Sequence, residues 1–346
     1  MMSSPPGRDL SRRARVTVKD LARHLGMSVS TVSRAFYNDA VIAPETRRRV
    51  LSKAREIGYQ PNPLARGLIT KSSRIVGVVV SDITNPFYPE VLTSLTEQIQ
   101  GTGFNVMLVV EQPDKSGTDG LDVLLSYHPD LVIILATTLS SHASEACRQV
   151  GTPVIFFNRH AADEHSFSVT CDNVAGGALV ADYLLDRGFR RPAFVSGRPD
   201  ASTNRDRWQG FAERCAERGL AEPAASQGRS FGYGEGYAGA LELLRGAERP
   251  DALFCANDIL AVGALDAIRR EAGLRVPDDI AVVGFDDIAM ASWPSYAITT
   301  VRQPVDRMIA ATVDLAVALT RGEVGHPAAQ RHPGTLIERS TTRVTP

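Results

Sequence analysis

The chain has 346 residues, of which 43% are hydrophobic, and its formal net charge at pH 7 is −1. This length is too great for one ordinary hydrophobic core and predicts about three folding units, a small one and a larger body of two lobes. No apolar run approaches the roughly twenty residues that a membrane span needs, and the N-terminal residues lack a secretory apolar segment, so we expect a cytoplasmic protein without a membrane partner.

The first predicted unit in chain order is a basic head. Residues 1–71 contain 14 Lys and Arg residues and 5 Asp and Glu residues, which leaves 24 basic and 34 acidic residues for 72–346. The charge of the whole chain therefore hides a basic and an acidic part, and the basic part is expected to contact nucleic-acid phosphates. A solvated basic face would also explain the charge, but not the helical pattern beside it. Residues 1–15 are expected to be a disordered basic arm.

Three short helices are predicted between residues 16 and 59. Thr17 can cap the first helix, with Asp20 three residues later, and Gly26 ends it. Ser28 can cap the second helix. The predicted inward positions are Val18, Leu21, Ala22 and Leu25 in the first helix and Val32 and Ala35 in the second. The second helix leaves outside Ser30, Thr31, Ser33 and Arg34, a pattern typical of a helix-turn-helix with an exposed recognition face.

A hinge is predicted directly after the head. Pro61-Asn62-Pro63 stops the third helix, and 64–68 follows as a short segment of helical pattern. We assign residues 16–61 to the head and residues 62–72 to the hinge. The hinge helix is too short to persist alone, so we expect it to order only when DNA and a second hinge are present.

Beyond the hinge, short β-rich apolar runs alternate with longer helical stretches. Runs that are apolar on both faces and separated by helices predict parallel sheets covered by helices, one in each lobe. The predicted fold class is therefore α/β, with an all-α head and a two-lobed body over 73–346. We place the N-lobe at about 73–171 and 303–330, and the C-lobe at about 172–302 and 331–343. The predicted strands are 75–80, 105–110, 131–135, 154–157, 193–196, 252–255 and 280–284.

Several motifs occur in a fixed order along the chain. They are Val16 to Arg34, Glu45-Thr46-Arg47, Gly58 to Asn62, Asn85-Pro86-Phe87-Tyr88, Asp172-Asn173, Arg207 with Gly210-Phe211, Ala256-Asn257-Asp258 and Val283 to Asp287. From Val16 to about Thr342 this set resembles the lactose repressor and galactose repressor family. The resemblance implies a helix-turn-helix head, a hinge helix and a body like that of periplasmic sugar-binding proteins, in a dimeric transcription factor that senses a small molecule.

The resemblance places the base-reading residues at Val29, Ser30 and Arg34. Arg34 can make two hydrogen bonds to guanine, whereas Val29 offers only apolar contact, for instance to a thymine methyl group. Small donors suit phosphate oxygens, and the residues expected in this role are Ser28, Thr31 and Ser33. The further DNA-binding residues that the resemblance implies are Thr17, Asn62, Ala65 and Leu68. Tyr37 departs from the asparagine that is usual in the family.

Leu68 is the most informative residue of the predicted hinge. It matches the leucine that the family inserts between base steps in the minor groove, a position where an apolar side chain can act as a wedge. Packing of Leu68 on the core of its own chain is the alternative. We expect the bound small molecule to act by changing the spacing of two paired hinges.

The small molecule is expected in the cleft between the lobes, because ligands of open α/β sheets bind beyond the carboxyl ends of the strands. Polar and aromatic residues follow the predicted strand ends, namely Asp82, Asn85, Phe87, Tyr88, Asn158, Arg159, Asn257, Asp258, Asp286 and Asp287. Donors and acceptors beside aromatic faces suit a hydroxylated ligand such as a sugar. The resemblance adds Arg207 to the site and supports Asp286 and Asn257, and Trp293 is a further candidate. Helix capping is the alternative role for Asn85 and Asn257, and Asn158 replaces an aspartate common in the family.

Two other classes of site are considered and set aside. The run 234–239 matches the letters of a dinucleotide-binding motif, but the preceding residues 226–233 are polar and glycine-rich, so we expect a loop that enters a helix over 237–244. The seven histidines form no pair with a nucleophile, and neither an enzyme activity nor a cofactor or metal is expected. The cysteines lie far apart and are predicted to be buried free thiols: Cys147, Cys171, Cys215 and Cys255.

The sequence therefore predicts a sequence-specific DNA-binding transcriptional regulator, which we expect to be a repressor. Two heads related by a twofold axis would read a palindromic operator, so a homodimer is expected. Four residues after Thr342 leave too little chain for an added tetramerising helix. The expected effector is a sugar or a related metabolite. The alternative function is a sugar-binding protein of the transport type, which would need an export signal and has no use for a basic helix-turn-helix.

Overall fold

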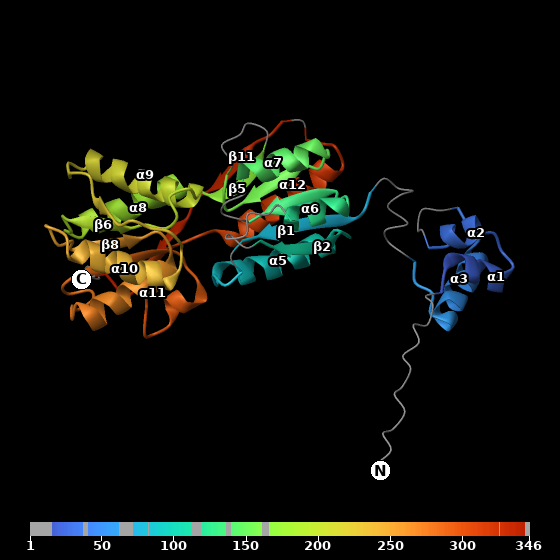
Figure 1. Cartoon of the computed structure of the whole chain (residues 1–346), viewed down its shortest axis with the longest axis horizontal. Coiled ribbons are helices and arrows are strands. Elements are labelled where there is room, and N and C mark those ends of the chain that lie inside the picture. Colours follow the sequence, from blue (N-terminus) through green and yellow to red (C-terminus); the bar gives the residue numbers. More distant parts are fainter. Residues whose placement is uncertain are drawn as a thin grey trace, which may run out of the picture. The chain divides into compact units, whose positions relative to one another are not determined.

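The computed structural model describes residues 16–36, 41–61, 72–81, 83–111, 119–135, 140–160, 166–324 and 326–342. The chain forms two compact units, a head up to residue 73 and a body from residue 74 (Figure 1). Each unit has its own hydrophobic core. The predicted site residues Asn62, Ala65, Leu68 and Asp82, together with Tyr37, lie outside the described residues.

The helices of the head are α1 (Val18–Leu25), α2 (Val29–Arg34) and α3 (Pro44–Ile57). Thr17 caps α1 in a capping box, because its hydroxyl accepts the Asp20 N–H at 3.3 Å and the Asp20 carboxylate accepts the Thr17 N–H at 3.0 Å. Gly26 ends α1 with φ at +63°, a conformation that glycine adopts at little cost. Ser28 caps α2 by accepting the Thr31 N–H at 3.1 Å. The predicted caps and turn are confirmed.

Apolar side chains of all three helices form the core of the head. Its buried members are Leu21, Ala22, Leu25, Val32, Ala35, Val50 and Ala54. Val18 is only partly buried against this core. The rings of Phe36 and Tyr59 meet edge to face with their centroids 5.6 Å apart. The inward face predicted for α2 is therefore confirmed, and its opposite face is left for other contacts.

The N-lobe of the body contains a six-stranded sheet in the order β11-β5-β4-β3-β1-β2, in which neighbouring strands are parallel. Alternate residues of β1 face opposite sides, so that Val78 packs in the core with α5 and α12, and Val79 packs in the core with α6 and α7. The strands are β1 (Ile75–Val80), β2 (Asn105–Val110), β3 (Leu131–Ile134), β4 (Val154–Phe157), β5 (Phe167–Cys171) and β11 (Ala329–His332). The helices are α5 (Phe87–Gly101), α6 (Asp119–Ser126), α7 (Ser140–Gln149) and α12 (Val305–Thr320).

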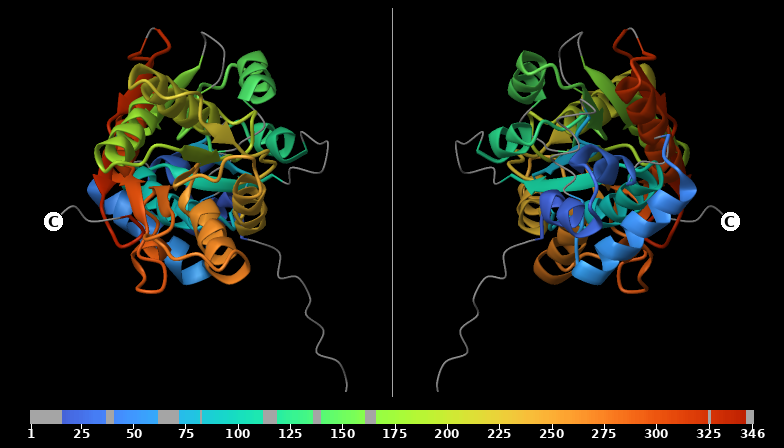
Figure 2. Two further views of the ribbon diagram at one scale, coloured as in Figure 1. Left: turned by 90° about the vertical axis from the view of Figure 1, so that its left-hand side faces the viewer. Right: turned by 90° about the vertical axis from the view of Figure 1, so that its right-hand side faces the viewer.

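The C-lobe contains a second six-stranded sheet in the order β12-β10-β9-β8-β6-β7, in which β12 alone runs antiparallel to its neighbour. Helices cover both faces of its strands, as Figure 1 and the end-on left view of Figure 2 show. The strands are β6 (Pro192–Val195), β7 (Ala224–Ala225), β8 (Ala252–Cys255), β9 (Ala281–Asp286), β10 (Thr299–Arg302) and β12 (Thr335–Ile337). The helices are α8 (Asn173–Asp186), α9 (Ser202–Glu217), α10 (Tyr233–Leu244), α11 (Asp258–Asp266), the π-helix η1 (Ala267–Glu271) and the 3-10 helix η2 (Ala289–Ser292). The predicted pair of helix-covered sheets is confirmed.

The chain passes between the two lobes three times, after β5, after β10 and between β11 and β12. We call these passages the three crossovers. On the N-lobe side His332 pairs with Cys171, and on the C-lobe side Thr335 pairs with Arg302. A Cβ atom on Gly334 would lie 3.3 Å from the Cys171 sulfur and 3.2 Å from the Arg302 carbonyl oxygen. The three crossovers therefore pack against one another around a residue that has no side chain.

Two expectations about secondary structure need correction. Five strands were not predicted, namely β5, β7, β10, β11 and β12, because they are short or rich in polar residues. The loop expected before Tyr237 is helical instead, since α10 begins at Tyr233. A Cβ on Gly236 would lie 2.1 Å from the Leu260 carbonyl oxygen, and one on Gly263 would lie 2.1 Å from the Tyr233 carbonyl oxygen. These glycines allow α10 and α11 to pack backbone against backbone.

The four cysteines are buried free thiols, as predicted. Burial raises the pKa of the Cys147 and Cys215 thiols to about 11 and that of Cys171 to about 12. Among the described residues, no group of three or more His, Cys, Asp or Glu side chains is placed to hold a metal ion. No helix in the same part of the chain is long and apolar enough to cross a membrane.

Candidate functional site

The first candidate site is the outer face of α2 in the head. Val29 is 42% exposed, and Ser28, Ser30 and Arg34 are also exposed, whereas Thr31 and Ser33 are half-buried. The Arg34 Nε donates to the Ser30 carbonyl oxygen at 3.4 Å, a long hydrogen bond that leaves its Nη atoms for other partners. The structure thus brings the predicted base-reading residues to one exposed face.

A cluster of hydroxyl groups lies at the start of α2. The Ser28 Oγ is 3.0 Å from the Ser30 Oγ and 2.8 Å from the Thr31 Oγ1. The same Ser28 oxygen also caps the helix. Because a hydroxyl has one donor and two acceptor positions, Ser28 is fully engaged within the head, which favours a structural role over a first contact with phosphate.

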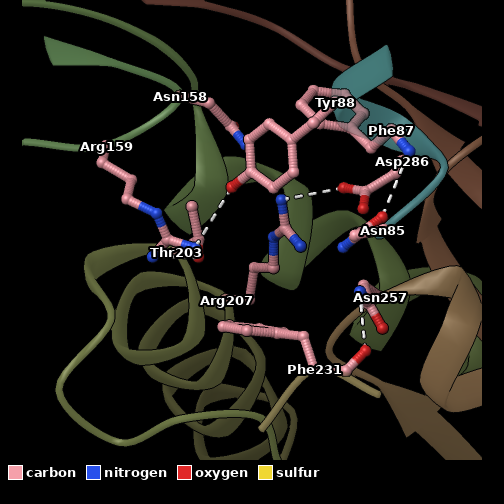
Figure 3. Close-up of a pocket in the computed structure, with 10 residues that line it drawn as sticks. All are labelled: Asn85, Phe87, Tyr88, Asn158, Arg159, Thr203, Arg207, Phe231, Asn257 and Asp286. Carbon is pink, nitrogen blue, oxygen red and sulfur yellow. Dashed lines mark hydrogen bonds and ion pairs between the residues drawn. The ribbon is translucent and has the colours of Figure 1, made fainter. Parts of the chain in front are cut away.

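The second candidate site is a pocket between the lobes of the body (Figure 3). Its residues come from loops and helix starts that follow the carboxyl ends of strands in both sheets. The N-lobe contributes Asn85, Phe87, Tyr88, Asn158 and Arg159. The C-lobe contributes Thr203, Arg207, Phe231, Asn257 and Asp286. Phe231 lies on one side of the Arg207 guanidinium group, and Phe87 and Tyr88 lie on the opposite side.

Arg207 is the buried anchor of the pocket and is 2% exposed. Its Nε donates to Asn173 Oδ1 at 2.9 Å, its Nη1 donates to the Ala256 carbonyl oxygen at 2.5 Å, and its Nη2 lies 3.2 Å from Asp286 Oδ1. The guanidinium carbon is 3.7 Å from the centroid of the Phe285 ring. Burial lowers the pKa of Arg207, and the nearby Asp286 carboxylate acts in the opposite direction. Groups of the chain itself therefore hold the arginine in place.

Close helix packing holds Arg207 in this place. A Cβ on Gly177 of α8 would lie 2.2 Å from the Arg207 carbonyl oxygen. A Cβ on Gly210 of α9 would lie 1.9 Å from the Val174 carbonyl oxygen. Only glycine permits this approach of the two backbones, which explains why Gly210-Phe211 accompanies Arg207 in the sequence.

Asp286 is the acidic partner in the pocket and ends β9 with φ at +112°, a strained conformation for a residue with a side chain. Its Oδ1 accepts hydrogen bonds from Arg207 and from Gln303 Nε2, the latter at 2.8 Å. Burial raises the pKa of Asp286, whereas Arg207 and the hydrogen bond from Gln303 act to lower it. Gln303 is 2% exposed, and its Oε1 has no hydrogen-bond partner among the described residues.

The N-lobe side of the pocket carries two further buried polar atoms without a partner in the described chain, Asn158 Oδ1 and Arg159 Nε. Asn158 is 5% exposed and has φ at +60°, a conformation that asparagine tolerates. The Arg159 Nη atoms reach Thr203 Oγ1 at 3.4 Å and the Tyr88 hydroxyl at 3.5 Å. Arg159 therefore contacts both lobes, and buried polar atoms of this kind normally find a partner.

Two asparagines of the site also cap helices, the alternative role considered for them. Asn257 caps α11 through its Oδ1, which accepts the Leu260 N–H at 2.9 Å. Asn85 Oδ1 accepts the Phe87 N–H at 3.1 Å at the start of α5. Both residues nevertheless line the pocket, so capping orients them toward it rather than excluding them.

The structure brings seven of the predicted effector residues together in one pocket: Asn85, Phe87, Tyr88, Asn158, Arg207, Asn257 and Asp286. Trp293 is 52% exposed in the loop after η2 and does not line this pocket. Arg159, expected at the same strand end as Asn158, also lines the pocket, whereas Thr203 and Phe231 were not predicted. Thr203 lies four residues before Arg207 on one helix, a spacing that could have revealed it. Phe231 lies in a polar stretch without a periodic signal.

Comparisons with known proteins agree with this architecture. Residues 17–62 match the family described as bacterial regulatory proteins, lacI family, and residues 181–342 match a periplasmic binding protein-like domain. The chain is similar to the ribose operon repressor of Escherichia coli (strain K12), with 30% identity over 304 residues that cover 87% of this chain and 92% of that protein. It is also similar to the HTH-type transcriptional repressor PurR of Mannheimia succiniciproducens, with 28% identity over 95% of this chain and 99% of the relative.

Among solved structures, the lac repressor dimer bound to operator and an anti-inducer has a TM-score of 0.84 and 26% identity, over 95% of this chain and 100% of that one. The chain belongs to the lacI family of bacterial regulatory proteins. The predicted resemblance is confirmed, and so is the fold of a helix-turn-helix head with a two-lobed α/β body. This lacI-family chain is therefore a DNA-binding transcriptional regulator of a kind that responds to small molecules. The relatives named here are repressors, not transport proteins or enzymes.

Proposed function

We propose that the chain is a homodimeric repressor that reads a palindromic operator through α2 and responds to a monosaccharide in the pocket between its lobes. The exposed face of α2 supports the first part, with Arg34 as the candidate for a guanine contact and Val29 for a thymine methyl group. One head reads one half-site, so a twofold dimer matches a palindrome.

Support for a sugar comes from the polar atoms around the pocket. Two lining residues, Asn158 and Arg159, each have a buried polar atom without a partner among the described residues. They add to the donors of Arg207 and the acceptors of Asp286, so that both kinds of hydrogen-bonding group are present. A small ring with several hydroxyl groups can donate to and accept from such a set. This unsatisfied hydrogen-bonding capacity is the observation that carries the proposal.

The aromatic residues fit the same ligand class. Phe87 and Phe231 come from opposite lobes and line the pocket on either side of the polar groups. Aromatic faces pack against the C–H surfaces of a sugar ring, while the ring edge meets the polar side chains. D-Ribose is the first probe to use, because the similar repressor of Escherichia coli is that of a ribose operon. Purine bases are the competing ligands to test, since a planar ring with polar edges could also pack between Phe87 and Phe231.

A thermal-shift screen of the full chain tests the ligand class. D-Ribose, other pentoses and hexoses, sugar phosphates, nucleosides and purine bases are each added at increasing concentration. We expect a monosaccharide to raise the melting temperature, because a ligand that binds only the folded state stabilises it. The shift should be lost in Arg159→Ala and retained in Arg148→Ala, whose side chain pairs with Glu145 on the surface of α7. A shift only with a purine base, or one retained in Arg159→Ala, would contradict the proposed ligand or its site.

A further inference from the structure

We propose that Asp287 couples the effector pocket to the three crossovers, as a positioning residue that acts through the second crossover. The inference rests on the proposed function and concerns its regulation. Asp286 and Asp287 are consecutive residues at the end of β9, and they contact consecutive residues at the end of β10. Asp286 Oδ1 accepts from Gln303 Nε2 at 2.8 Å, and Asp287 Oδ2 accepts from Arg302 Nε at 2.6 Å.

Arg302 lies where two crossovers run side by side. It is the last residue of β10, directly before the chain leaves for α12 in the N-lobe. It also pairs with Thr335, the first residue of β12, directly after the third crossover. A Cβ on Gly334 would meet the Arg302 carbonyl oxygen at 3.2 Å and the Cys171 sulfur of the first crossover at 3.3 Å. A displacement of Arg302 would therefore alter the packing of all three crossovers.

The second oxygen of Asp287 makes the contact rigid. Its Oδ1 accepts from Arg339 Nη2 at 2.6 Å, and Arg339 Nη1 donates to the Ile298 carbonyl oxygen at 2.8 Å. The Asp287 side chain is 6% exposed and that of Arg339 is 17% exposed, so this ion pair is largely shielded from solvent, whereas the Arg302 side chain is 56% exposed. Charge-assisted hydrogen bonds of this length are among the strong ones in proteins. Asp287 thus has no freedom to move without the end of β10.

The backbone around the two aspartates is strained and firmly held. The φ angle of +112° at Asp286 is one that residues with a side chain seldom adopt, and Asp287 follows with φ at +58°, in the left-handed region that aspartate tolerates. Asp258 is fully buried and accepts hydrogen bonds from the Ile288 N–H at 2.9 Å and from the Thr300 hydroxyl at 2.6 Å. These bonds tie the segment after β9 to β10. Strain held in this way persists only where the surroundings over-determine it.

These contacts give a route from ligand to lobe orientation. A ligand that hydrogen-bonds to Asp286 shifts this side chain and, through their hydrogen bond, Gln303. Asp287 moves with Asp286 and carries Arg302 along through their ion pair. The end of β10 is therefore displaced as a unit. Without the Asp287 charge, a ligand can still meet Asp286 and Arg207, but Arg302 is no longer held by the turn that follows β9, and only the Gln303 contact to Asp286 remains. Loss of this residue should separate binding from the change in lobe orientation.

The distance between the two lobes reports the ligand-induced change in lobe orientation directly. Spin labels are attached to Gln100→Cys on α5 and Ala216→Cys on α9, two exposed positions on different lobes. The native thiols are buried and stay protonated, so labelling is directed to the new cysteines. Full-length labelled chains are mixed with an excess of unlabelled chains, so that electron–electron resonance reports distances within one chain. D-Ribose is the probe, and its Kd is measured by calorimetry for each variant.

The variants are Asp287→Asn, Arg302→Gln and the control Asp186→Asn, which removes a surface ion pair to Arg218. Arg302 has a side chain that is 56% exposed, so its variant tests the same contact if Asp287→Asn fails to fold. We expect both test variants to bind D-ribose like the wild type but to lose the D-ribose-induced distance shift, and to show a broader ligand-free distribution. Asp186→Asn should match the wild type.

Two outcomes separate this inference from the proposed function. Distance distributions of Asp287→Asn and Arg302→Gln that match the wild type in width and in ligand response would overturn the coupling role. If D-ribose binds none of the proteins, including the wild type, then D-ribose is not the effector. The ligand-free widths then decide the coupling role alone, with broadening in both test variants supporting it and unchanged widths refuting it.

Discussion

The recognition helix α2 and the pocket between the lobes are built in opposite ways. The exposed face of α2 is formed within one continuous segment, Ser28 to Arg34, and the Ser28 side chain caps the helix and bonds the neighbouring hydroxyl groups. The pocket instead joins residues from Asn85 to Asp286, it is buried, and its central arginine and aspartate neutralise each other. A surface that reads DNA can be assembled locally, whereas a pocket that closes on a ligand needs charges removed from water and therefore long-range partners.

The largest effect is expected from removing the buried arginine. Arg207→Ala leaves Asp286 buried without its partner and should lower the free energy of unfolding of the body by about 3–5 kcal/mol. Urea denaturation of the full chain followed by tryptophan fluorescence measures it. The control Arg214→Ala lies on the same helix and removes exposed ion pairs to Asp182 and Glu217, which should cost under about 1 kcal/mol. Similar losses in both variants would contradict the account of the pocket.

The next effect tests whether the glycines of α10 serve helix packing. Gly236→Ala places a Cβ 2.1 Å from the Leu260 carbonyl oxygen and should lower the free energy of unfolding by about 1–3 kcal/mol. Gly234→Ala, two residues away, meets nothing within 4 Å and should be neutral or stabilising by about 0.5–1 kcal/mol. Thermal unfolding of both variants gives the comparison. Equal stability would show that the close approach of α10 and α11 is not the reason for these glycines.

Variants of Arg34 test the recognition face of α2, which is formed by residues close together in the sequence. Arg34→Ala should weaken binding to a selected operator by about 1–3 kcal/mol without changing the stability of the body. Arg34→Lys keeps the charge but not the two parallel donors, so it should retain affinity for unrelated DNA while losing discrimination at one base position. Fluorescence anisotropy with the operator and with single-base variants measures both. Unchanged discrimination in the lysine variant would remove Arg34 from the base-reading residues.

The smallest effect concerns the cap of α2. Ser28→Ala removes the acceptor of the Thr31 N–H and should destabilise the head by about 1 kcal/mol. Ser52→Ala, at an exposed position within α3, should be neutral or slightly stabilising because alanine has the higher helix propensity. Amide exchange of the head residues distinguishes the two. If Ser28→Ala weakens DNA binding strongly and leaves exchange unchanged, then Ser28 contacts phosphate rather than serving mainly as a cap.

The comparison also explains how much the sequence alone could predict. The helices of the head and the apolar strands of the body were predictable because their signals are local, such as Thr17 before Asp20 or the apolar run of β1. Strands such as β10 were missed because Thr299 and Thr300 are polar. Their hydroxyl groups are satisfied by Arg339 and Asp258, contacts that no local pattern reveals.

The pocket was predictable only in part, and for a related reason. Parallel topology places residues that follow strand ends near one another, which located Asn85, Asn158 and Asp286. Phe231 follows no predicted strand and reaches the pocket from a glycine-rich loop, so neither periodicity nor topology identified it. Trp293 follows a strand in sequence, but η2 and the turn after it leave its side chain in solvent.

The most direct test of the central claim joins the two regions in one measurement. Operator DNA selected by the full chain is titrated with protein, with and without D-ribose or whichever monosaccharide stabilises the fold. We predict a palindromic operator whose Kd changes by about 5- to 150-fold with the sugar in the wild type and remains unchanged by it in Arg159→Ala. Sugar binding that leaves the operator Kd of the wild type unchanged would contradict the account.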